Sequence, residues 1–176
     1  DVHYNFLILQ RIENIDVYNK SLGAFAENLA KNNNHRHALD ALALIKSKTE
    51  KQQALSQAIL FAHTEKDISL YFKQLNHSNK ARYITSYIQK NEATQSSAKT
   101  LAFIEKITLK HPLKGPQAFT PLILKTRLYA DISDAENVSN ELNRAGKLLS
   151  KNSFPVDDDI LENYIQLHVQ YGDIKQ

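Results

Sequence analysis

The chain has 176 residues, with 22 Lys and Arg against 19 Asp and Glu, and a formal net charge of +3. Because it contains no cysteine, disulfides, cysteine-ligated metals and cysteine nucleophiles are excluded. No apolar run approaches the roughly 18 residues that a membrane-spanning helix needs, so no membrane partner is expected. With only four Pro and four Gly among many helix formers, the composition predicts an all-α protein.

The first residues, DVHYNFLILQ, have neither a basic start nor a cleavage-site pattern, so no signal peptide is expected. The chain also contains no methionine. We therefore expect it to be part of a longer protein.

Hydrophobic periodicity predicts four helical hairpins after a preceding helix or cap over residues 1–15. The expected helix pairs are 22–31 with 37–47, 52–63 with 68–75, 82–90 with 97–109, and 119–129 with 134–149. A last helix over 160–171 follows three aspartates, which suit the positive end of a helix. Gly172 fits the left-handed position that ends a helix, and residues 173–176 look like the first turn of its partner. The last repeat is therefore expected to be truncated.

One spacing recurs along the chain: an apolar pair, six residues, then a small or polar residue followed by Asp-Ile. It occurs with the Asp-Ile pair at 67–68, 131–132 and 173–174. Two looser copies bring the mean period to about 36 residues, which is typical of helical-hairpin repeats. Residues 16–176 are thus predicted to form a right-handed α-solenoid of about five repeats without a sheet. The alternative is one irregular bundle of short antiparallel helices.

Three segments carry a family resemblance. FPVDDDILENYIQLHVQYGDIKQ resembles the join between two pentatricopeptide repeats, with a Pro-Asp-type loop, an Asn before an apolar pair, and a Gly-Asp turn. IDVYNKSLGAF is similar to that family's Asp-x-x-Tyr-Asn-x-Leu-Ile helix opening, and FTPLILKTRLYADISDAENVSNELNRAG resembles one unit that ends at Gly146, after its second helix. The resemblance covers most of residues 16–176, is closest in the C-terminal third, and is strongest to the degenerate repeats of fungal mitochondrial proteins. Tetratricopeptide repeats are the alternative, although Leu22-Gly23 alone matches their landmarks and the chain has no Trp.

The pentatricopeptide resemblance implies that the chain binds single-stranded RNA, with side chains of the first helix and of the loop reading one base per repeat. The helix positions are Lys20, Gln57, Ser86, Pro121 and Asn163, and the loop position is Asp158. Pro121 has no side-chain donor, so its repeat is not expected to read a base. Ser86, Asn163 and the aspartates have an alternative interpretation as helix caps. The resemblance also implies a mitochondrial matrix location and a role in RNA processing, stability or translation; without it, a cytoplasmic location is expected.

Lys125 and Arg127 belong to the most basic stretch of the chain, residues 106–151. RNA binding needs positive charge along the groove, so we expect these two side chains to contact phosphates. The alternative is an ordinary solvated surface.

No catalytic or metal-binding pattern emerges. His35 and His37 are two residues apart and do not share a helix face, and the aspartates at 157–159 lack the spacing of a calcium loop. We therefore expect a non-enzymatic protein without cofactors, which binds single-stranded RNA or, alternatively, a peptide or protein. RNA binding predicts basic residues aligned with Ser86 and Asn163. The scaffold alternative predicts a groove of mixed polar and apolar lining, with basic charge outside it.

Overall fold

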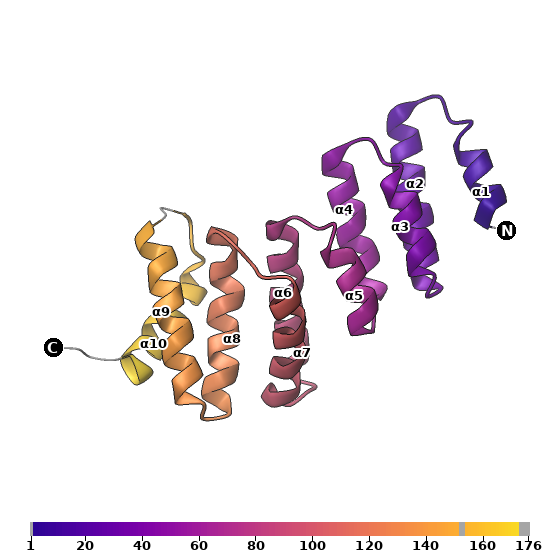
Figure 1. Cartoon of the computed structure of the whole chain (residues 1–176). Helices are drawn as coiled ribbons and strands as arrows, with labels where there is room; N and C mark the ends of the chain where they lie inside the picture. The colour runs from indigo at the N-terminus through magenta and orange to yellow at the C-terminus, as the bar shows by residue number, and fades with distance from the viewer. Residues whose placement is uncertain (1, 152–153, 173–176) are drawn as a thin grey trace. The chain divides into compact units, whose positions relative to one another are not determined.

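The computed structural model describes residues 2–151 and 154–172, and this part of the chain is helical without any strand (Figure 1). The prediction of an all-α protein is therefore confirmed. The helices are α1 Val2–Leu9, α2 Ile15–Lys31, α3 His35–Ala43, α4 Lys48–Ala58, η1 Ile59–Phe61, α5 Glu65–Phe72, α6 His77–Asn91, α7 Ser97–Lys110, η2 Pro116–Ala118, α8 Phe119–Asp131, α9 Ala135–Lys151 and α10 Asp158–Tyr171.

Each predicted helix overlaps an observed one, and the differences lie at the ends. The largest difference is in α2, which begins at Ile15 instead of residue 22. The side chain of Asn14 explains this early start, because its oxygen accepts hydrogen bonds from the backbone N–H groups of Asp16 (3.0 Å) and Val17 (3.1 Å). The predicted helix 52–63 is observed as α4 followed by the 3-10 turn η1.

The chain forms two compact units, the first reaching Asn79 and the second starting at Lys80 within α6. In the first unit, α2 packs against both α3 and α4. Its core side chains include Leu22, Ala26, Leu42, Leu55 and Phe72. In the second unit, α8 is central, because it contacts α7, α9 and α10. This central position explains why most α8 side chains are buried.

Two hairpins, α2–α3 and α8–α9, end their first helices with the same hydrogen bonds. Asn34 N donates to Leu29 O (2.8 Å) and Asn33 N to Ala30 O (3.0 Å). One hundred residues later, Asp134 N donates to Tyr129 O and Ser133 N to Ala130 O, both at 2.9 Å. Asn33 (φ 57°) and Ser133 (φ 60°) adopt the left-handed conformation that this turn requires.

The buried positions of these two hairpins correspond as well. The buried residues of the first hairpin include Leu22, Leu29, Ala38, Ala41, Leu42 and Ile45, and their counterparts Leu122, Tyr129, Val138, Glu141, Leu142 and Ala145 are also buried. The two hairpins therefore share one pattern of core-facing positions, although few of the residues are identical.

The recurring Asp-Ile spacing does not mark equivalent structural positions. Asp131 ends α8 and Ile132 is its C-cap, whereas Asp67 and Ile68 lie inside α5. The third copy, at residues 173–174, lies outside the described residues, as does the predicted first turn of a partner helix. The copies differ in position because an apolar pair fits any turn of an amphipathic helix. The spacing between the pair and Asp-Ile therefore does not determine where in a helix the motif falls.

The prediction that Gly146 follows a helix is wrong, and the prediction for Gly172 is confirmed only in its position at the end of a helix. Gly146 lies inside α9 instead of following it, and the hydroxyl of Tyr164 from α10 would be only 3.3 Å from a Cβ added there. Gly172 does end α10, but its backbone is extended (φ −67°, ψ 136°) instead of left-handed. Close approach between elements therefore explains Gly146, and positive φ explains neither glycine.

The first unit also contains a buried polar contact between α3 and α5. His35 is 5% exposed, and its Nδ1 lies 3.1 Å from the hydroxyl of Tyr71. Burial, together with the nearby carboxylate of Asp67, raises the pKa of Tyr71 to about 12. His37, in contrast, is exposed, and its Nδ1 contacts Asn34 Oδ1 at 2.6 Å. The two histidine side chains therefore do not share a face of α3, as expected.

Candidate functional site

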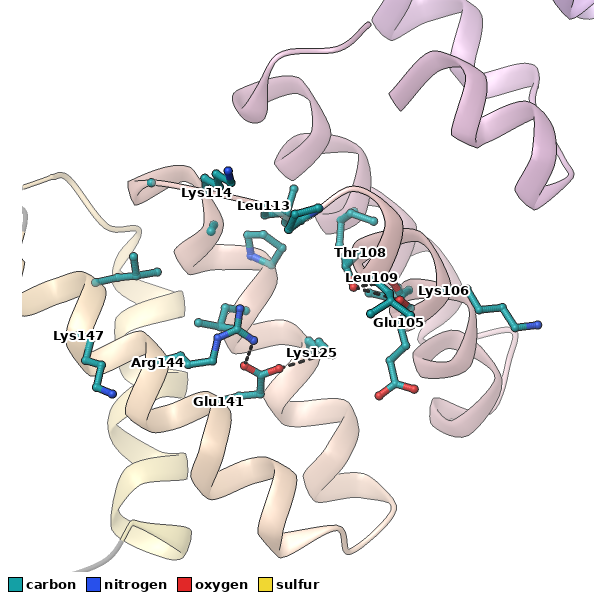
Figure 2. A pocket seen from close by; sticks show the side chains of 18 of the residues that line it. Glu105, Lys106, Thr108, Leu109, Leu113, Lys114, Lys125, Glu141, Arg144 and Lys147 are labelled. Carbon is teal, nitrogen blue, oxygen red and sulfur yellow. Dashed lines mark hydrogen bonds and ion pairs between the residues drawn. The ribbon is translucent and has the colours of Figure 1, made fainter. Parts of the chain in front are cut away.

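A cleft of about 990 Å³ lies in the second unit, among α7, the loop that follows it, α8 and α9 (Figure 2). Most of the exposed surface inside it is apolar. The apolar lining residues are Ile84, Ala102, Ile104, Leu109, Pro112, Leu113, Ala118, Pro121, Leu122 and Leu148. Leu109 is 85% exposed, which is a large solvent exposure for a leucine side chain.

The loop between α7 and α8 forms one edge of the cleft. Pro112 follows the end of α7 at Lys110, and Pro116 begins the 3-10 turn η2 that leads into α8. Between them, Gly115 has φ 73°, a conformation that side chains with a Cβ rarely adopt. The two prolines and this glycine therefore restrict the backbone of the loop between α7 and α8.

A carboxylate with two cationic partners lies in the cleft lining. The Glu141 side chain is only 7% exposed, and its two oxygens accept hydrogen bonds from Lys125 Nζ (3.0 Å) and Arg144 Nη1 (2.5 Å). The Lys125 ammonium also lies 5.0 Å from the centre of the Tyr129 ring. Lys125, predicted to contact RNA phosphates, is thus a largely buried member of an ion-pair network.

The second acidic residue of the cleft, Glu105, is also engaged. Its carboxylate accepts a hydrogen bond from the hydroxyl of Tyr129. Burial and this hydrogen bond, with the negative charges of Glu105, Glu141 and Asp134, raise the pKa of Tyr129 well above its ordinary value. Tyr129 therefore stays protonated at neutral pH and serves as the donor.

The remaining basic side chains of the cleft differ in direction. Figure 2 shows Arg144 meeting Glu141 within the cleft, whereas Lys106 projects away from it. Lys114 in the loop and Lys147 on α9 are exposed. Within residues 2–151 and 154–172, neither of these two lysines belongs to an ion pair.

A smaller hollow of about 350 Å³ lies between α8 and α10. Its lining is mainly polar, and it brings together two of the predicted RNA-binding residues, Arg127 and Asn163, with Asp131, Gln166, Leu167, Gln170 and Tyr171. Arg127 is already paired with Glu92 at 2.5 Å. Asn163 Nδ2 donates to the backbone oxygen of Asp159 at 2.8 Å, which leaves its side-chain oxygen available as an acceptor.

The other predicted site residues do not join this hollow. Lys20 on α2 and Gln57 on α4 are exposed in the first unit, and Ser86 is exposed on α6. Pro121 is buried and lines the cleft instead. Asp158 lies exposed in the first turn of α10.

Ser86, Asn163 and the aspartates at 157–159 have an alternative interpretation as helix caps, and only Asp157 among them is an N-cap. Asp157 is the N-cap of α10, because its side chain accepts from the N–H of Asp159 at 3.1 Å. Ser86 and Asn163 lie in the middle of α6 and α10, so their interpretation as helix caps is wrong.

Sequence reasoning missed the buried polar residues. Glu141 lies at helical spacing with the buried apolar residues Val138, Leu142 and Ala145, so a carboxylate on the apolar face of α9 was a detectable signal. Asn19 occupies a similar place on α2 and is 3% exposed. Its side chain donates to Glu50 (2.7 Å) and accepts from the N–H of Lys46 (3.2 Å), which ties α2 to α4 and the segment before it.

Compared with known proteins, the chain matches no family model, no curated protein and no solved structure. In the part of the chain that the structure describes, no three His, Asp or Glu residues are arranged to hold a metal ion. None of the described helices is both long and apolar enough to cross a membrane. The resemblance to pentatricopeptide repeats therefore stays a prediction.

Proposed function

We propose that this chain is a non-enzymatic interaction module that binds a peptide segment of a partner protein in the cleft among α7, α8 and α9. One observation carries the proposal: the cleft is lined mainly by apolar side chains, and Leu109 in its wall is 85% exposed. Exposed apolar concavities in globular proteins are typical of binding sites. The mixed apolar and polar lining also fits one half of the expectation for a tetratricopeptide-like scaffold, whereas the basic side chains in this lining differ from the expected placement of basic charge outside the groove.

For the fold, we propose that the helical hairpins stack as a right-handed solenoid of about five repeats, of the tetratricopeptide or pentatricopeptide type. The shared turn geometry and shared buried positions of α2–α3 and α8–α9 support this arrangement.

A carboxylate in the cleft wall is expected to weaken peptide binding. Random peptides of about 12 residues, long enough for three helical turns, are displayed on phage and selected on the wild-type chain. The selected peptides are expected to bind Leu109→Asp at least about tenfold more weakly, because their apolar anchors meet a charge. Fluorescence anisotropy with the synthetic peptides measures the loss.

The matched control is Val169→Asp, which makes the same kind of change at a 75% exposed residue of α10 outside the cleft. It should bind the selected peptides like the wild type. If the Leu109→Asp variant retains full affinity, the peptides bind elsewhere and the cleft is not the site.

A second candidate function, binding of single-stranded RNA, is favoured by the hollow between α8 and α10. Its amide side chains, the Arg127 guanidinium and the Tyr171 ring can hydrogen-bond base edges and stack on bases. In this proposal the module acts on organellar transcripts, with Asn163 as a base-reading residue. It ranks second because Arg127 is already ion-paired, and Lys125 and Arg144 are bound to Glu141 across α8 and α9 instead of lying beside Asn163.

The RNA candidate predicts that Asn163→Ala weakens binding to some sequences of a labelled single-stranded RNA pool by about fivefold to tenfold, as loss of one base contact would. Affinity should also fall steeply as salt rises, because phosphate contacts release counterions. Asn140→Ala, an exposed asparagine on α9, is the control and should leave affinity unchanged. Absence of binding even at low salt would remove this candidate.

A further inference from the structure

We infer that the peptide bound by the cleft is acidic: an amphipathic helix whose apolar side enters the cleft while its carboxylates meet Arg144 and Lys147. This inference rests on the proposed peptide-binding function and adds the chemistry of the partner.

The lining of the cleft carries more basic than acidic side chains. Five basic residues line it, of which Lys106 projects away from the cleft, and the two acidic residues are Glu105 and Glu141. Both carboxylates are engaged within the protein, Glu105 by Tyr129 and Glu141 by Lys125 and Arg144. Without Lys106, the cations outnumber the acids by two, four against two, so the cleft has an unmatched positive charge that favours an anionic ligand.

Arg144 is fixed on one side by Glu141 and is still open to a ligand. One of its nitrogens binds Glu141 at 2.5 Å, yet its side chain is 62% exposed. A guanidinium has five N–H donors, so others remain for a carboxylate. Because Glu141 fixes one side of the group, a ligand binds it with a smaller loss of side-chain entropy.

The spacing of the basic side chains along α9 suits a helical ligand. Arg144 and Lys147 lie three residues apart on α9, so they lie on neighbouring turns of one helix face. Lys114 adds a further cation at the loop edge of the cleft. Carboxylates one helical turn apart on a partner helix match this arrangement, and the apolar anchors on the same helix follow the usual spacing of helices bound in grooves.

The apolar lining favours an acidic peptide over a nucleic acid. A phosphate backbone carries its charge on every unit and needs a polar, basic track. In this cleft the cations line the same surface as the exposed Leu109 and the half-buried Leu113, which aliphatic or aromatic side chains of a peptide would cover.

The test uses three synthetic peptides of about 14 residues that place leucine at helical spacing and differ only in their polar positions, which hold Glu, Gln or Lys. The Glu peptide is expected to bind at least about tenfold more tightly than the Lys peptide, and to weaken as salt rises. Lys147→Gln and Arg144→Gln should each weaken the Glu peptide about threefold to fivefold and leave the Gln peptide unchanged. Isothermal titration calorimetry measures these affinities.

Lys99→Gln is the matched control, because it removes the same charge from an exposed position of α7 outside the cleft. Thermal unfolding by circular dichroism checks that each variant remains folded. Equal affinity for the three peptides would overturn the acidic partner while leaving the peptide-binding function intact. Binding of none of them would overturn the inference as well, and the phage selection would then decide the proposed function by itself. If the Arg144 and Lys147 variants lose affinity for single-stranded RNA instead, the cleft binds nucleic acid and both proposals are wrong.

Discussion

Replacing Phe119 by alanine is expected to lower the free energy of unfolding of the second unit by about 3–5 kcal/mol. Phe119 begins α8 and is 1% exposed. Its ring centre lies 5.7 Å from that of Phe154 and 5.8 Å from that of Tyr164, so one side chain joins the start of α8 to α10 and to the segment before it. The truncation would remove both aromatic contacts and leave a cavity that rigid helices cannot close.

Urea denaturation followed by circular dichroism measures this loss, and hydrogen exchange shows whether α8 and α10 are the helices that become less protected. Phe119→Leu refills much of the volume and should cost less than half as much. Leu109→Ala, at an exposed position, should change the free energy of unfolding by less than about 0.5 kcal/mol. If Phe119→Ala cost no more than this exposed substitution, Phe119 would not be a core contact.

The substitution Glu141→Gln is expected to lower the free energy of unfolding by about 3 kcal/mol, within the range seen when one partner of a buried ion pair is removed. The change keeps the size of the side chain but removes its charge. Lys125, whose side chain is 15% exposed, would then keep its ammonium in the protein without its carboxylate partner. Arg144 is 62% exposed and can turn to water, so most of the loss comes from Lys125.

Glu136→Gln is the matched control, because it makes the same chemical change at an exposed position of the same helix. It should cost less than about 1 kcal/mol, which is the contribution of an acidic residue near a helix N-terminus. The double variant Glu141→Gln, Lys125→Met should recover part of the loss, since no buried charge is left alone. Equal losses at positions 136 and 141 would show that the network does not contribute to stability.

Local sequence signals were enough to predict the fold class and the approximate positions of the helices. Scarce Pro and Gly, together with apolar residues at helical spacing, were enough to predict helix pairs that overlap α2 to α9, because these signals act within a few residues of the chain. Pro112, Gly115 and Pro116 lie at the break between α7 and α8, where their local backbone preferences favour a loop.

Which side chains share a site depends on how the helices pack, and local signals did not predict it. Lys125 belongs to a basic stretch of sequence, yet its ammonium binds a buried carboxylate from the next helix. The resemblance to pentatricopeptide repeats predicted that Gly146 follows a helix. The structure places it inside α9, facing the hydroxyl of Tyr164. The cleft is lined by residues from α7, α8 and α9. The distance between those helices cannot be predicted from local sequence patterns. The physical reason is that helix formation depends on neighbours along the chain, whereas the packing of one helix on another depends on side chains far apart in sequence.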